Sequence, residues 1–554
     1  MTATMPALDQ NHGEVFTRRW VVDVLLDLVG YDADRDLGEL RLVEPSCGTG
    51  AFLRPAVERL IRSAQNADRD LRSLDGAIRA YDLQPGNVRA ARLVCRDLLA
   101  AAGASAPVAA GLARSWVRRA DFLLDDDDDR EADFAVGNPP YIRYDDLSNE
   151  VAVKYRTAWQ TMRGRGDIYV GFFERCLSIL KADGKVGFIC ADRWMRNQYG
   201  AALRELVSRE YSVEQVWTMH GVDAFEEKVS AYPAITVIAN KAQGPVVVAD
   251  MEDSFSENSA KSLVKWSTRG RSAAFSGPGV KAHRLPHWFG GSDLWPTGTP
   301  ARLALVEHLN DRYYPLHDPE NTGTRVSIGV ATGADKVYIT KDGSAVESDR
   351  ILPMAMSGDL MSGNFEWQGN YLINPWSEDG SLVELEDYPQ MSEYFSRHPQ
   401  LRTRHVAKKA PARWYRTIDK VHADLLARPK LLLQDMKSAI HPVYEPGGFY
   451  PHHNLYYIVS DIWDLEVLGG LLLSRVSQAF IEAYCVRMRG GTLRFQAQYL
   501  KKIRVPRPSS LDRMISAELK SAFRSRDTEA ATRAAAKVYE IDLEEYELLS
   551  AGKN

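Results

Sequence analysis

The sequence predicts an α/β protein with a doubly wound sheet, because short apolar runs alternate with stretches whose apolar residues recur at helical spacing. Four runs are typical of buried parallel strands: LRLVEP (40–45), DFAVGNPP (133–140), KVGFICA (185–191) and AITVIANK (234–241). Helical periodicity marks residues 21–29, 51–62, 170–182 and 201–210. We therefore expect the first part of the chain to form one large sheet flanked by helices.

The chain of 554 residues is too long for a single core, and its composition divides it into four segments. We expect the main α/β domain over 1–245. A stretch rich in Ser, Gly, Pro and His, 246–320, is interpreted as a linker and the entry to a second domain. Short strands, turns and helices predict a mixed α+β domain over 321–510, and 511–554 is predicted to be a charged helical tail.

The composition excludes several classes of protein. Hydrophobic residues make up 45% and charged residues 26%, which is ordinary for a globular protein, and no apolar run approaches the roughly 20 residues of a membrane span. The N-terminus lacks the basic and apolar segments of a secretory signal. Five scattered cysteines, never in CxxC spacing, argue against zinc and a disulfide framework. We expect a cytoplasmic protein with no metal and no membrane partner.

A small-residue turn follows the first predicted strand, within LVEPSCGTGAFL (42–53). Glu44 ends the strand, and Gly48 and Gly50 let a ligand approach the backbone at the carboxyl end, where open sheets bind ligands. The GxG spacing has no third glycine after it, which counts against NAD. The turn therefore indicates a ligand site without identifying the ligand.

Two further strand ends carry acidic residues. Asp82, at the end of the strand in AYDLQPG, can accept hydrogen bonds from both hydroxyls of a ribose, although an acidic helix cap is the alternative. In RRADFLLDD (118–126), Asp121 could accept from the amino group of an adenine while Phe122 packs on its ring. The alternative there is a simple surface turn. Together the two segments favour an adenosine-containing ligand.

The most informative motif is Asn138-Pro139-Pro140-Tyr141, directly after a predicted buried strand. Two consecutive prolines cannot continue a ladder, so the chain enters a rigid extended turn. The amide oxygen of Asn138 and the carbonyl of Pro139 can both accept hydrogen bonds from one planar amino group. Such acceptors localise the nitrogen lone pair for attack on a methyl donor, and Tyr141 offers a face on which a base can stack.

These motifs carry a resemblance to a known family. EPSCGTG followed by NPPY resembles the amino-methyltransferases, and HGEVFTRRWVVDVLLDL (12–28) resembles the N-terminal cofactor motif of the gamma-class, TaqI-type N6-adenine DNA methyltransferases. The threonine that this family places against the methionine part of the cofactor corresponds to Thr17, although Arg18 stands where the family usually has proline. VDAFEEKVSAYPAITVI (222–238) resembles the segment with the second stacking aromatic, which corresponds to Phe225.

The resemblance implies a class I S-adenosylmethionine-dependent methyltransferase over 1–245 and a target-recognition domain over 321–510. It implies methyl transfer from S-adenosyl-L-methionine to N6 of an adenine flipped out of double-stranded DNA. A separate cognate restriction endonuclease is an expected partner, and a single recognition domain favours a monomer. The implied catalytic residues are Asn138, Pro139, Pro140, Tyr141 and Phe225. The implied cofactor-binding residues are Thr17, Glu44, Ser46, Gly48, Gly50, Asp82, Asp121, Phe122 and Pro140.

Basic residues gather in two stretches of the second half, although the net charge of the chain is −5. Residues 396–440 hold eleven Lys and Arg against three Asp, with aromatic residues interleaved, and 484–507 hold seven Lys and Arg and no acid. Such clusters in an acidic chain favour contact with DNA over the alternative of a solvated surface. The residues expected to contact DNA are Lys408, Lys409, Arg413, Arg416, Arg489 and Arg494.

Three other interpretations remain open. NPPY also occurs in enzymes that methylate a glutamine of a release factor or an exocyclic amine of ribosomal RNA, but those enzymes are shorter and lack a large second domain. N4-cytosine methylation is the second, and Asn138 disfavours it because serine more often holds that position there. The third is a DNA-binding scaffold with a vestigial pocket, which the presence of Glu44, Asp82, Asn138 and Tyr141 disfavours.

Overall fold

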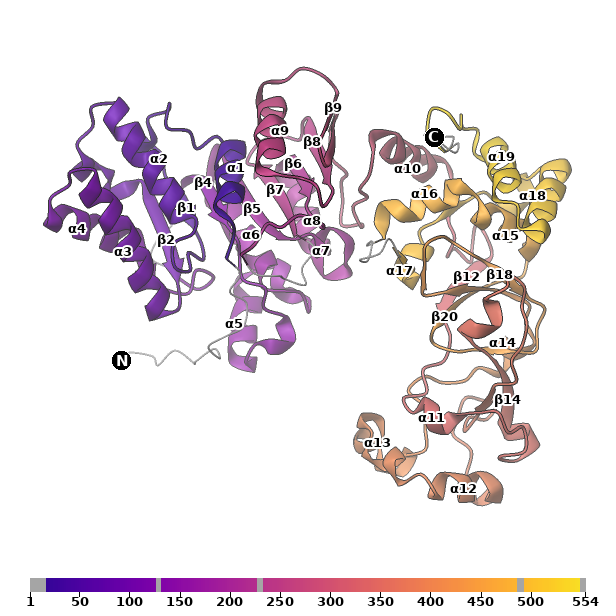
Figure 1. Ribbon diagram of the computed structural model, residues 1–554. Coiled ribbons are helices and arrows are strands. Elements are labelled where there is room, and N and C mark those ends of the chain that lie inside the picture. Colours follow the sequence, from indigo (N-terminus) through magenta and orange to yellow (C-terminus); the bar gives the residue numbers. More distant parts are fainter. Residues whose placement is uncertain (1–15, 126–130, 227–232, 486–492, 549–554) are drawn as a thin grey trace. The chain divides into compact units, whose positions relative to one another are not determined.

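The computed structural model describes residues 16–125, 131–226, 233–485 and 493–548. Its chain forms two compact units, Met1–Pro300 and Ala301–Asn554 (Figure 1). In the described part of the chain, no helix is both long and apolar enough to cross a bilayer.

A ten-stranded sheet forms the centre of the first unit, in the order β3-β2-β1-β4-β5-β7-β6-β8-β10-β9. One half is parallel: β3 (Val117–Arg119), β2 (Ile78–Asp82), β1 (Leu42–Glu44), β4 (Ala132–Gly137) and β5 (Leu180–Ala191). The other half is mixed: β7 (Pro233–Ala239), β6 (Ser212–Thr218), β8 (Val246–Met251), β10 (Val280–Leu285) and β9 (Ala274–Gly277). The predicted α/β fold class is confirmed.

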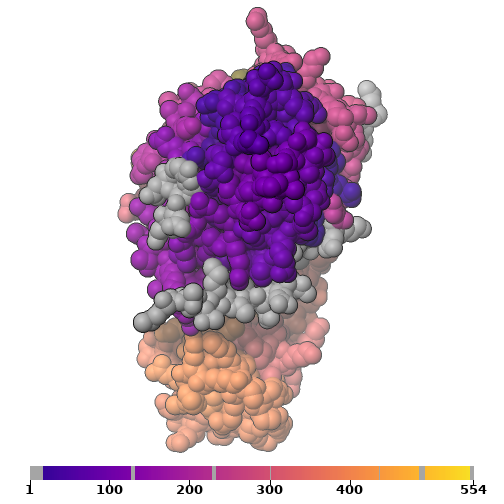
Figure 2. Space-filling model, turned by 90° about the vertical axis from the view of Figure 1, so that its left-hand side faces the viewer, coloured from indigo at the N-terminus to yellow at the C-terminus, as the bar shows by residue number. Residues whose placement is uncertain are grey.

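Helices cover both faces of this sheet. The helices of this unit are α1 (Arg19–Val29), α2 (Leu53–Asn66), α3 (Pro85–Ala101), α4 (Ala106–Trp116), α5 (Asn149–Ala158), α6 (Tyr169–Ser178), α7 (Arg193–Arg196), α8 (Ala201–Glu210) and α9 (Glu257–Arg269). Phe134 and Val136 of β4 pack in the core with α1–α4 and α9, whereas Ala135 packs in the core with α6 and α8. This alternation along one strand gives the sheet two buried faces. Figure 2 shows one face of this unit, on which the earlier residues are indigo and purple and the later ones pink.

Two predictions for this unit need correction. The run 234–241 was expected to be a parallel strand, but β7 lies antiparallel to both β5 and β6. An apolar run shows only that a strand is buried on both faces, and not its direction. The helix expected over 170–182 ends at Ser178, because the chain turns there into β5.

The linker expected over 246–320 is also corrected. Strands β8, β10 and β9 extend the large sheet, and Ser256 caps the start of α9, because its hydroxyl accepts from the backbone N–H of Ser259. Residues 286–299 then pack back on the first unit, where the buried Arg204 donates to the carbonyls of Ser292 and Asp293. The boundary between the compact units falls at Pro300, so the Ser- and Gly-rich composition of this segment did not mark a linker.

Two four-stranded sheets form the centre of the second unit. One contains β12 (Thr324–Ile328), β20 (Leu455–Ser460), β16 (Lys430–Gln434) and β18 (Val443–Glu445), and the other contains β13 (Ile339–Thr340), β15 (Tyr371–Ile373), β14 (Ile351–Ala355) and β19 (Tyr450–Pro451). Two-stranded sheets add β11 (Tyr314–Pro315) with β22 (Arg504–Val505), and β17 (Met436–Lys437) with β21 (Leu493–Arg494). The expected mixed α+β composition is observed.

The helices of this unit are α10 (Pro300–Arg312), α11 (Asp335–Tyr338), α12 (Pro389–Ser396), α13 (His405–Lys409), α14 (Ala423–Ala427), α15 (Leu465–Leu473), α16 (Arg475–Tyr484), α17 (Ala497–Leu500), α18 (Arg513–Ser525) and α19 (Thr528–Tyr539). Of the segment 511–554, expected as a helical tail, the described residues 511–548 pack onto the unit through α18 and α19. Gly469 and Gly470 of α15 lie against Phe523 and Leu519 of α18, where a side chain on either glycine would clash. Small residues here let the two helices approach closely.

A fully buried ion pair joins two strands of the second unit. The ammonium of Lys430 lies 2.5 Å from a carboxylate oxygen of Glu445, and both side chains are 0% exposed. Lys430 also donates to the carbonyl of Phe449, and Glu445 accepts from the N–H of Gly447. Burial lowers the pKa of Lys430 and raises that of Glu445, because desolvation opposes both charges. The charged form of each side chain is therefore stabilised by the charge of the other.

We expect Lys430→Met to lower the free energy of unfolding by about 3–5 kcal/mol, because it leaves the Glu445 carboxylate buried without its cation. The double variant Lys430→Met/Glu445→Leu should recover much of this loss. Denaturant unfolding followed by circular dichroism measures both. Lys537→Met is the matched control, since Lys537 and its partner Glu518 are about half exposed, and it should cost less than about 1 kcal/mol. Equal losses in Lys430→Met and Lys537→Met would contradict the role of burial.

Candidate active site

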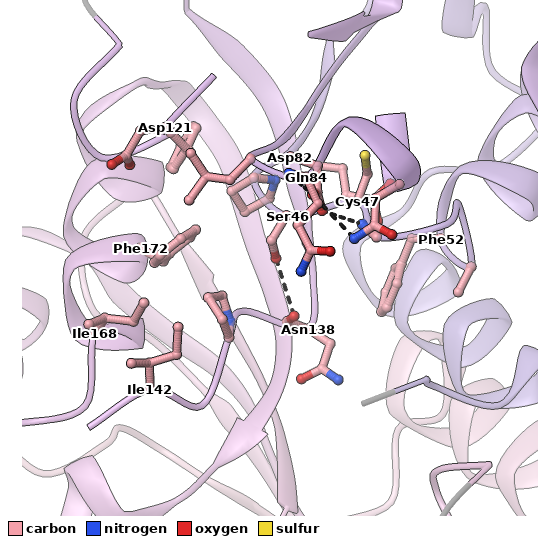
Figure 3. Close-up of a pocket in the computed structure, with 18 of the residues that line it drawn as sticks. Ser46, Cys47, Phe52, Asp82, Gln84, Asp121, Asn138, Ile142, Ile168 and Phe172 are labelled. Carbon is pink, nitrogen blue, oxygen red and sulfur yellow. Dashed lines mark hydrogen bonds between the residues drawn. The ribbon is translucent and has the colours of Figure 1, made fainter. Parts of the chain in front are cut away.

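One cavity, of about 190 Å³, lies at the carboxyl ends of the parallel strands (Figure 3). Strands β3, β2, β1 and β4 are parallel neighbours in that order, so their carboxyl ends meet at one edge of the sheet. Asp121, Asp82, Glu44 and Asn138 lie at or just beyond these ends in the same order, and all four line the cavity. The predicted motifs, distant in sequence, thus form one continuous site.

Asp82 fixes the glycine turn. Its carboxylate accepts from the backbone N–H of Gly48 at 3.0 Å and from that of Gln84 at 2.8 Å, and Asn87 donates to it at 3.3 Å. The helix-cap alternative is not observed, since the N-cap of α3 is Gln84 and Asp82 is the last residue of β2. Each carboxylate oxygen can accept more than one hydrogen bond, which leaves Asp82 able to bind the hydroxyls of a ligand.

The two glycines of the turn serve different purposes. Gly48 has φ +51°, and a side chain built there would meet no atom within 4 Å, so this part of the turn faces open space. Gly50 has φ +101°, and a side chain there would meet the backbone of Ala91 in α3 at 3.5 Å. Positive φ favours glycine at both positions. Gly48 leaves room for a ligand, whereas at Gly50 the backbone conformation is the reason for glycine, because the distance to Ala91 is an ordinary contact.

Glu44 is a buried acid at the centre of the site. Glu44 is only 1% exposed, and one oxygen of its carboxylate has no hydrogen-bond partner among the described residues. Burial and the neighbouring Asp82 carboxylate raise the pKa of Glu44 well above its usual range. A buried carboxylate is stabilised by a cation, and a ligand that carries an ammonium group would supply one.

An aromatic pocket surrounds Asp121 at one end of the cavity. Its carboxylate accepts from the hydroxyl of Tyr155 at 2.8 Å and from the N–H of Leu123 at 3.0 Å, and burial raises its pKa. Phe122 stacks on Phe172 with ring centroids 5.7 Å apart. The sequence analysis did not identify Tyr155 or Phe172, which are on helices α5 and α6 and belong to no motif. This end of the cavity fits a planar ring with a polar edge.

Asn138 is held from two sides. Its side-chain N–H group donates to the hydroxyl of Thr17 at 3.3 Å. The hydroxyl of Ser46 donates to its backbone carbonyl at 3.3 Å, as Figure 3 shows. Pro140 also lines the cavity. The ring of Tyr141 lies edge-on to Tyr169, with centroids 6.4 Å apart, and burial raises the pKa of its hydroxyl. Tyr141 lies outside the lining of the cavity itself.

Phe225 lies on a loop that is tied to the N-terminal segment. Thr17 and Phe225 form an antiparallel backbone bridge, Arg18 donates to the carbonyl of Ala224 at 3.0 Å, and Glu226 donates to that of Phe16 at 2.9 Å. The Phe225 side chain, 5% exposed, packs in the apolar core rather than in the lining of the cavity. Phe16, which the sequence analysis did not identify, lines the cavity beside Thr17.

The residues predicted to contact DNA belong to the second unit. Lys408, Lys409 and Arg413 are exposed, and Arg416 is half-buried. Arg489 lies outside the described residues, and Arg494 is in β21.

Two other members of the 396–440 cluster are structural. Arg404 donates to the carbonyls of Thr332, Trp414 and Arg416, and Lys430 is in the buried pair with Glu445. The basic surface is therefore smaller than the composition of the cluster suggests.

One group among the described residues has ligand types suited to a metal: Asp335, His452 and His453. One ring nitrogen of His452 lies 3.1 Å from the Asp335 carboxylate, and the other accepts from the N–H of Asn454 at 3.4 Å. Both nitrogens of His452 thus have partners within the protein, and the ring carries its hydrogen toward Asp335. We interpret the group as a hydrogen-bonded pair beside a second histidine.

Comparison with known proteins identifies the family of this chain. Residues 111–225 match the family model of the Eco57I restriction-modification methylases. The chain is 42% identical to the Type II methyltransferase M.PaeR7I of Pseudomonas aeruginosa, over 96% of this chain and 92% of that protein. It is 40% identical to the Type II methyltransferase M.XhoI of Xanthomonas vasicola, over 98% and 100%. The fold is similar to that of the Type IIL restriction-modification enzyme MmeI, with a TM-score of 0.57 and 11% identity over 97% of this chain and 74% of that chain.

The sheet of the first unit has the fold of a class I methyltransferase. Within that class, the chain belongs to the Type II methyltransferases of restriction-modification systems. The expected resemblance to modification methyltransferases is thereby confirmed.

The buried carboxylate of Glu44 predicts a pH-dependent affinity for S-adenosylhomocysteine. Because the pKa of Glu44 is raised, the charged form, and with it the attraction for an ammonium group, increases as pH rises above the usual carboxyl pKa of about 4.3. Calorimetry should show affinity increasing with pH in the wild type and nearly constant in Glu44→Gln.

5′-Methylthioadenosine, which has no ammonium group, is the control ligand for this prediction. Its affinity should change little over the same pH range in both proteins. An equal pH response to the two ligands would assign the effect to a group other than Glu44.

Proposed function

We propose that this protein transfers a methyl group from S-adenosyl-L-methionine to N6 of an adenine flipped out of double-stranded DNA, within a specific sequence. The observation that carries the proposal is the order of side chains along the sheet edge. Asp121, Asp82, Glu44 and Asn138 follow the neighbouring strands β3, β2, β1 and β4. This order matches the order of chemical groups in the cofactor, followed by the target amine.

The residues along the cavity fit the cofactor group by group. Phe122 and Phe172 provide apolar surfaces for the adenine ring, and Asp121 provides an acceptor for its amino group. Asp82 can accept from the ribose hydroxyls. Glu44 would take the ammonium of the methionine part, which supplies the positive charge that this buried acid requires. When bound, the cofactor supplies an electrophilic methyl group, which this order of groups directs toward the Asn138 side.

Asn138 would prepare the amine for attack. The lone pair of an adenine amino group is delocalised into the ring, so the nitrogen is weakly nucleophilic. The amide oxygen of Asn138 and the carbonyl of Pro139 accept hydrogen bonds from the two hydrogens of the amino group. These bonds favour a tetrahedral nitrogen with a localised lone pair. After the transfer, the nitrogen carries the methyl group and a positive charge, and it then loses one of its two original hydrogens as a proton. Asn138 follows β4 directly, and contacts from Thr17 and Ser46 hold it in place.

The target base has to leave the helix before it reaches this site. An amine within a stacked duplex lies out of reach of groups at the bottom of a cavity, so the base is flipped out. We propose that Tyr141 and Phe225 stack on the flipped base, which requires Phe225 to turn out of the core where it now packs. Aromatic stacking contributes on the order of 1–3 kcal/mol per base, comparable with the cost of unstacking.

The second unit would hold the DNA, and the exposed Lys408, Lys409 and Arg413 supply positive charge for its phosphates. The similarly folded MmeI was solved in complex with DNA. We further propose that the protein acts as a cytoplasmic monomer beside a separate cognate restriction endonuclease.

Asn138→Ala should reduce the rate of methyl transfer at least about 10²-fold, because it removes an acceptor that acts mainly in the transition state. The affinity for S-adenosylhomocysteine should change little. Transfer of labelled methyl to DNA from a host that lacks the enzyme measures the rate, and Asn258→Ala, at an exposed asparagine on α9, is the matched control. Full activity in Asn138→Ala would refute the assigned role.

Mass spectrometry of nucleosides from the methylated DNA should identify N6-methyladenine. N4-methylcytosine would replace the adenine assignment while leaving the cofactor site in place. Methylation of a protein glutamine or of ribosomal RNA, with no product on DNA, would overturn the proposal. Where a modified base is found, sequencing the modified positions in DNA of a host that expresses the protein gives the recognised sequence.

The salt dependence of DNA affinity tests the basic surface. Each neutralised phosphate contributes a slope of about 0.9 to log affinity against log salt, so Lys408→Ala/Lys409→Ala/Arg413→Ala should lower the slope by up to about 2.7. Its matched control is Lys261→Ala/Lys265→Ala/Arg269→Ala, three exposed basic residues on α9, which should leave the slope unchanged. An unchanged slope in the first variant would mean a merely solvated surface. Lost sequence preference at constant slope would mean base contacts instead.

A further inference from the structure

The chain between residues 142 and 168 carries arginines that the sequence analysis did not identify. Ile142 and Ile168 both line the cavity, and the backbone N–H of Ile168 donates to the carbonyl of Ile142 at 2.9 Å. Between them the chain leaves the cavity wall directly after the NPPY turn, forms α5 and returns (Figure 1). We call its two loops, 143–146 and 163–166, the arginine loops, because they hold three exposed arginines: Arg143, Arg163 and Arg165.

Contacts between the two arginine loops gather these side chains on one surface. The guanidinium of Arg156 in α5 lies 4.1 Å from the ring centroid of Tyr144 and donates to the carbonyl of Gly164 at 3.3 Å. The side chain of Arg165 forms an ion pair with Asp145 at 2.5 Å. Both contacts join the first loop to the second, so the two loops lie side by side although α5 separates them in sequence.

The second arginine loop is fastened on the side of Asn138 where β5 lies. β4 lies between β1 and β5 in the sheet, so the residues after β5 lie beyond Asn138 along the edge, away from the ends of β1, β2 and β3. Tyr199 is one of these residues, in a short 3₁₀ helix that follows α7. A side chain on Gly166 would collide with the ring of Tyr199, so the loop packs directly on that ring. The arginine loops are therefore beside the part of the edge that the proposed cofactor contacts leave open.

Gly164 lies between two of the arginines, and the fold does not require glycine there. Its φ is −80°, which any residue adopts, and a side chain built on it would meet nothing closer than Tyr199 at 3.8 Å, an ordinary contact. A glycine in such a place lets another backbone approach closely. Next to guanidinium groups, the backbone that fits by charge is one that carries phosphates.

The acids of the arginine loops leave the guanidinium groups available. They are Asp145 and Asp146, and both are exposed. In the pair of Arg165 with Asp145 the side chains are 72% and 65% exposed, and a pair so open to water contributes little. Arg165 can therefore exchange Asp145 for a phosphate. Asp167, the next acid along the chain, accepts from the hydroxyl of Tyr199 at 3.4 Å.

We propose that the arginine loops bind the phosphate backbone of the target strand next to the flipped base. This inference rests on the proposed function and adds a DNA-binding surface on the unit that carries the catalytic residues. The guanidinium groups of Arg143 and Arg163 donate to phosphate oxygens, and Gly164 lets the strand come close. Phosphates held here keep the strand in place while its base lies at Asn138.

The salt dependence of DNA affinity counts the phosphates that the arginine loops neutralise. At about 0.9 per phosphate, Arg143→Ala/Arg163→Ala should lower the slope of log affinity against log salt by up to about 1.8. The probe is a duplex with the recognised sequence. The matched control is Arg62→Ala/Arg114→Ala, at exposed arginines near the C-terminal ends of α2 and α4, which should leave the slope unchanged. Both variants should bind S-adenosylhomocysteine like the wild type.

Neutral phosphates locate the contact on the DNA. In a second duplex, methylphosphonates replace the two phosphates on each side of the target adenine in its own strand. The wild type should bind this duplex at least about fivefold more weakly, whereas Arg143→Ala/Arg163→Ala should lose less than about twofold, because its alanines have no charge to pair. The same replacement one helical turn away should weaken both proteins equally.

Gly164→Ala tests the close approach without removing charge. The added methyl group fits the fold, so thermal stability should not fall, but DNA affinity should decrease by at least about threefold because the methyl group stands in the way of the strand. Gly111→Ala in α4, where a side chain also meets nothing within 4 Å, is the matched control and should bind DNA like the wild type.

Three results would overturn the inference: an unchanged salt slope in Arg143→Ala/Arg163→Ala, equal loss from methylphosphonates beside the target in that variant and the wild type, or full DNA affinity in Gly164→Ala. Failure of the wild type to bind DNA, or no modified base in host DNA, would instead count against the proposed function.

Discussion

The site depends on one constraint, the parallel alignment of β3, β2, β1 and β4. Parallel neighbours end at the same edge, so residues that leave each strand are brought within reach of one ligand. Asp121, Asp82, Glu44 and Asn138 occupy these positions in order. Their spacing follows from the distance between neighbouring strands, about 4.8 Å. An extended ligand can therefore contact all four side chains along the sheet edge without any one loop having to reach far.

A second constraint brings the N-terminal segment onto that edge. Hydrogen bonds between residues 16–18 and 224–226 hold Thr17 beside Asn138, although the two lie far apart in sequence. The same bonds fix the loop that carries Phe225. The N-terminal segment and the NPPY turn thus line the cavity side by side, and the loop after β6 holds the N-terminal segment from behind. A substitution in any one of these three segments is therefore expected to shift the other two.

The second unit uses its charges in two ways. Arg404 donates to three backbone carbonyls and braces the segment around it, and Lys430 neutralises Glu445 within the core. Lys408, Lys409 and Arg413 face solvent and are available to a polyanion. Charge counted along a sequence therefore overstates the surface that can bind DNA, because arginine and lysine also satisfy buried acceptors.

The sequence by itself determined the α/β class, the strand ends at Glu44 and Asp82, and the NPPY turn, because strand, turn and proline signals are local. Only the tertiary structure decided the antiparallel direction of β7 and the place of residues 246–299 in the first unit. It alone brought Tyr155 to Asp121 and Thr17 to Asn138. The physical reason is that these contacts join distant segments. The order of strands in the sheet decides which distant segments meet, and no local sequence pattern encodes that order.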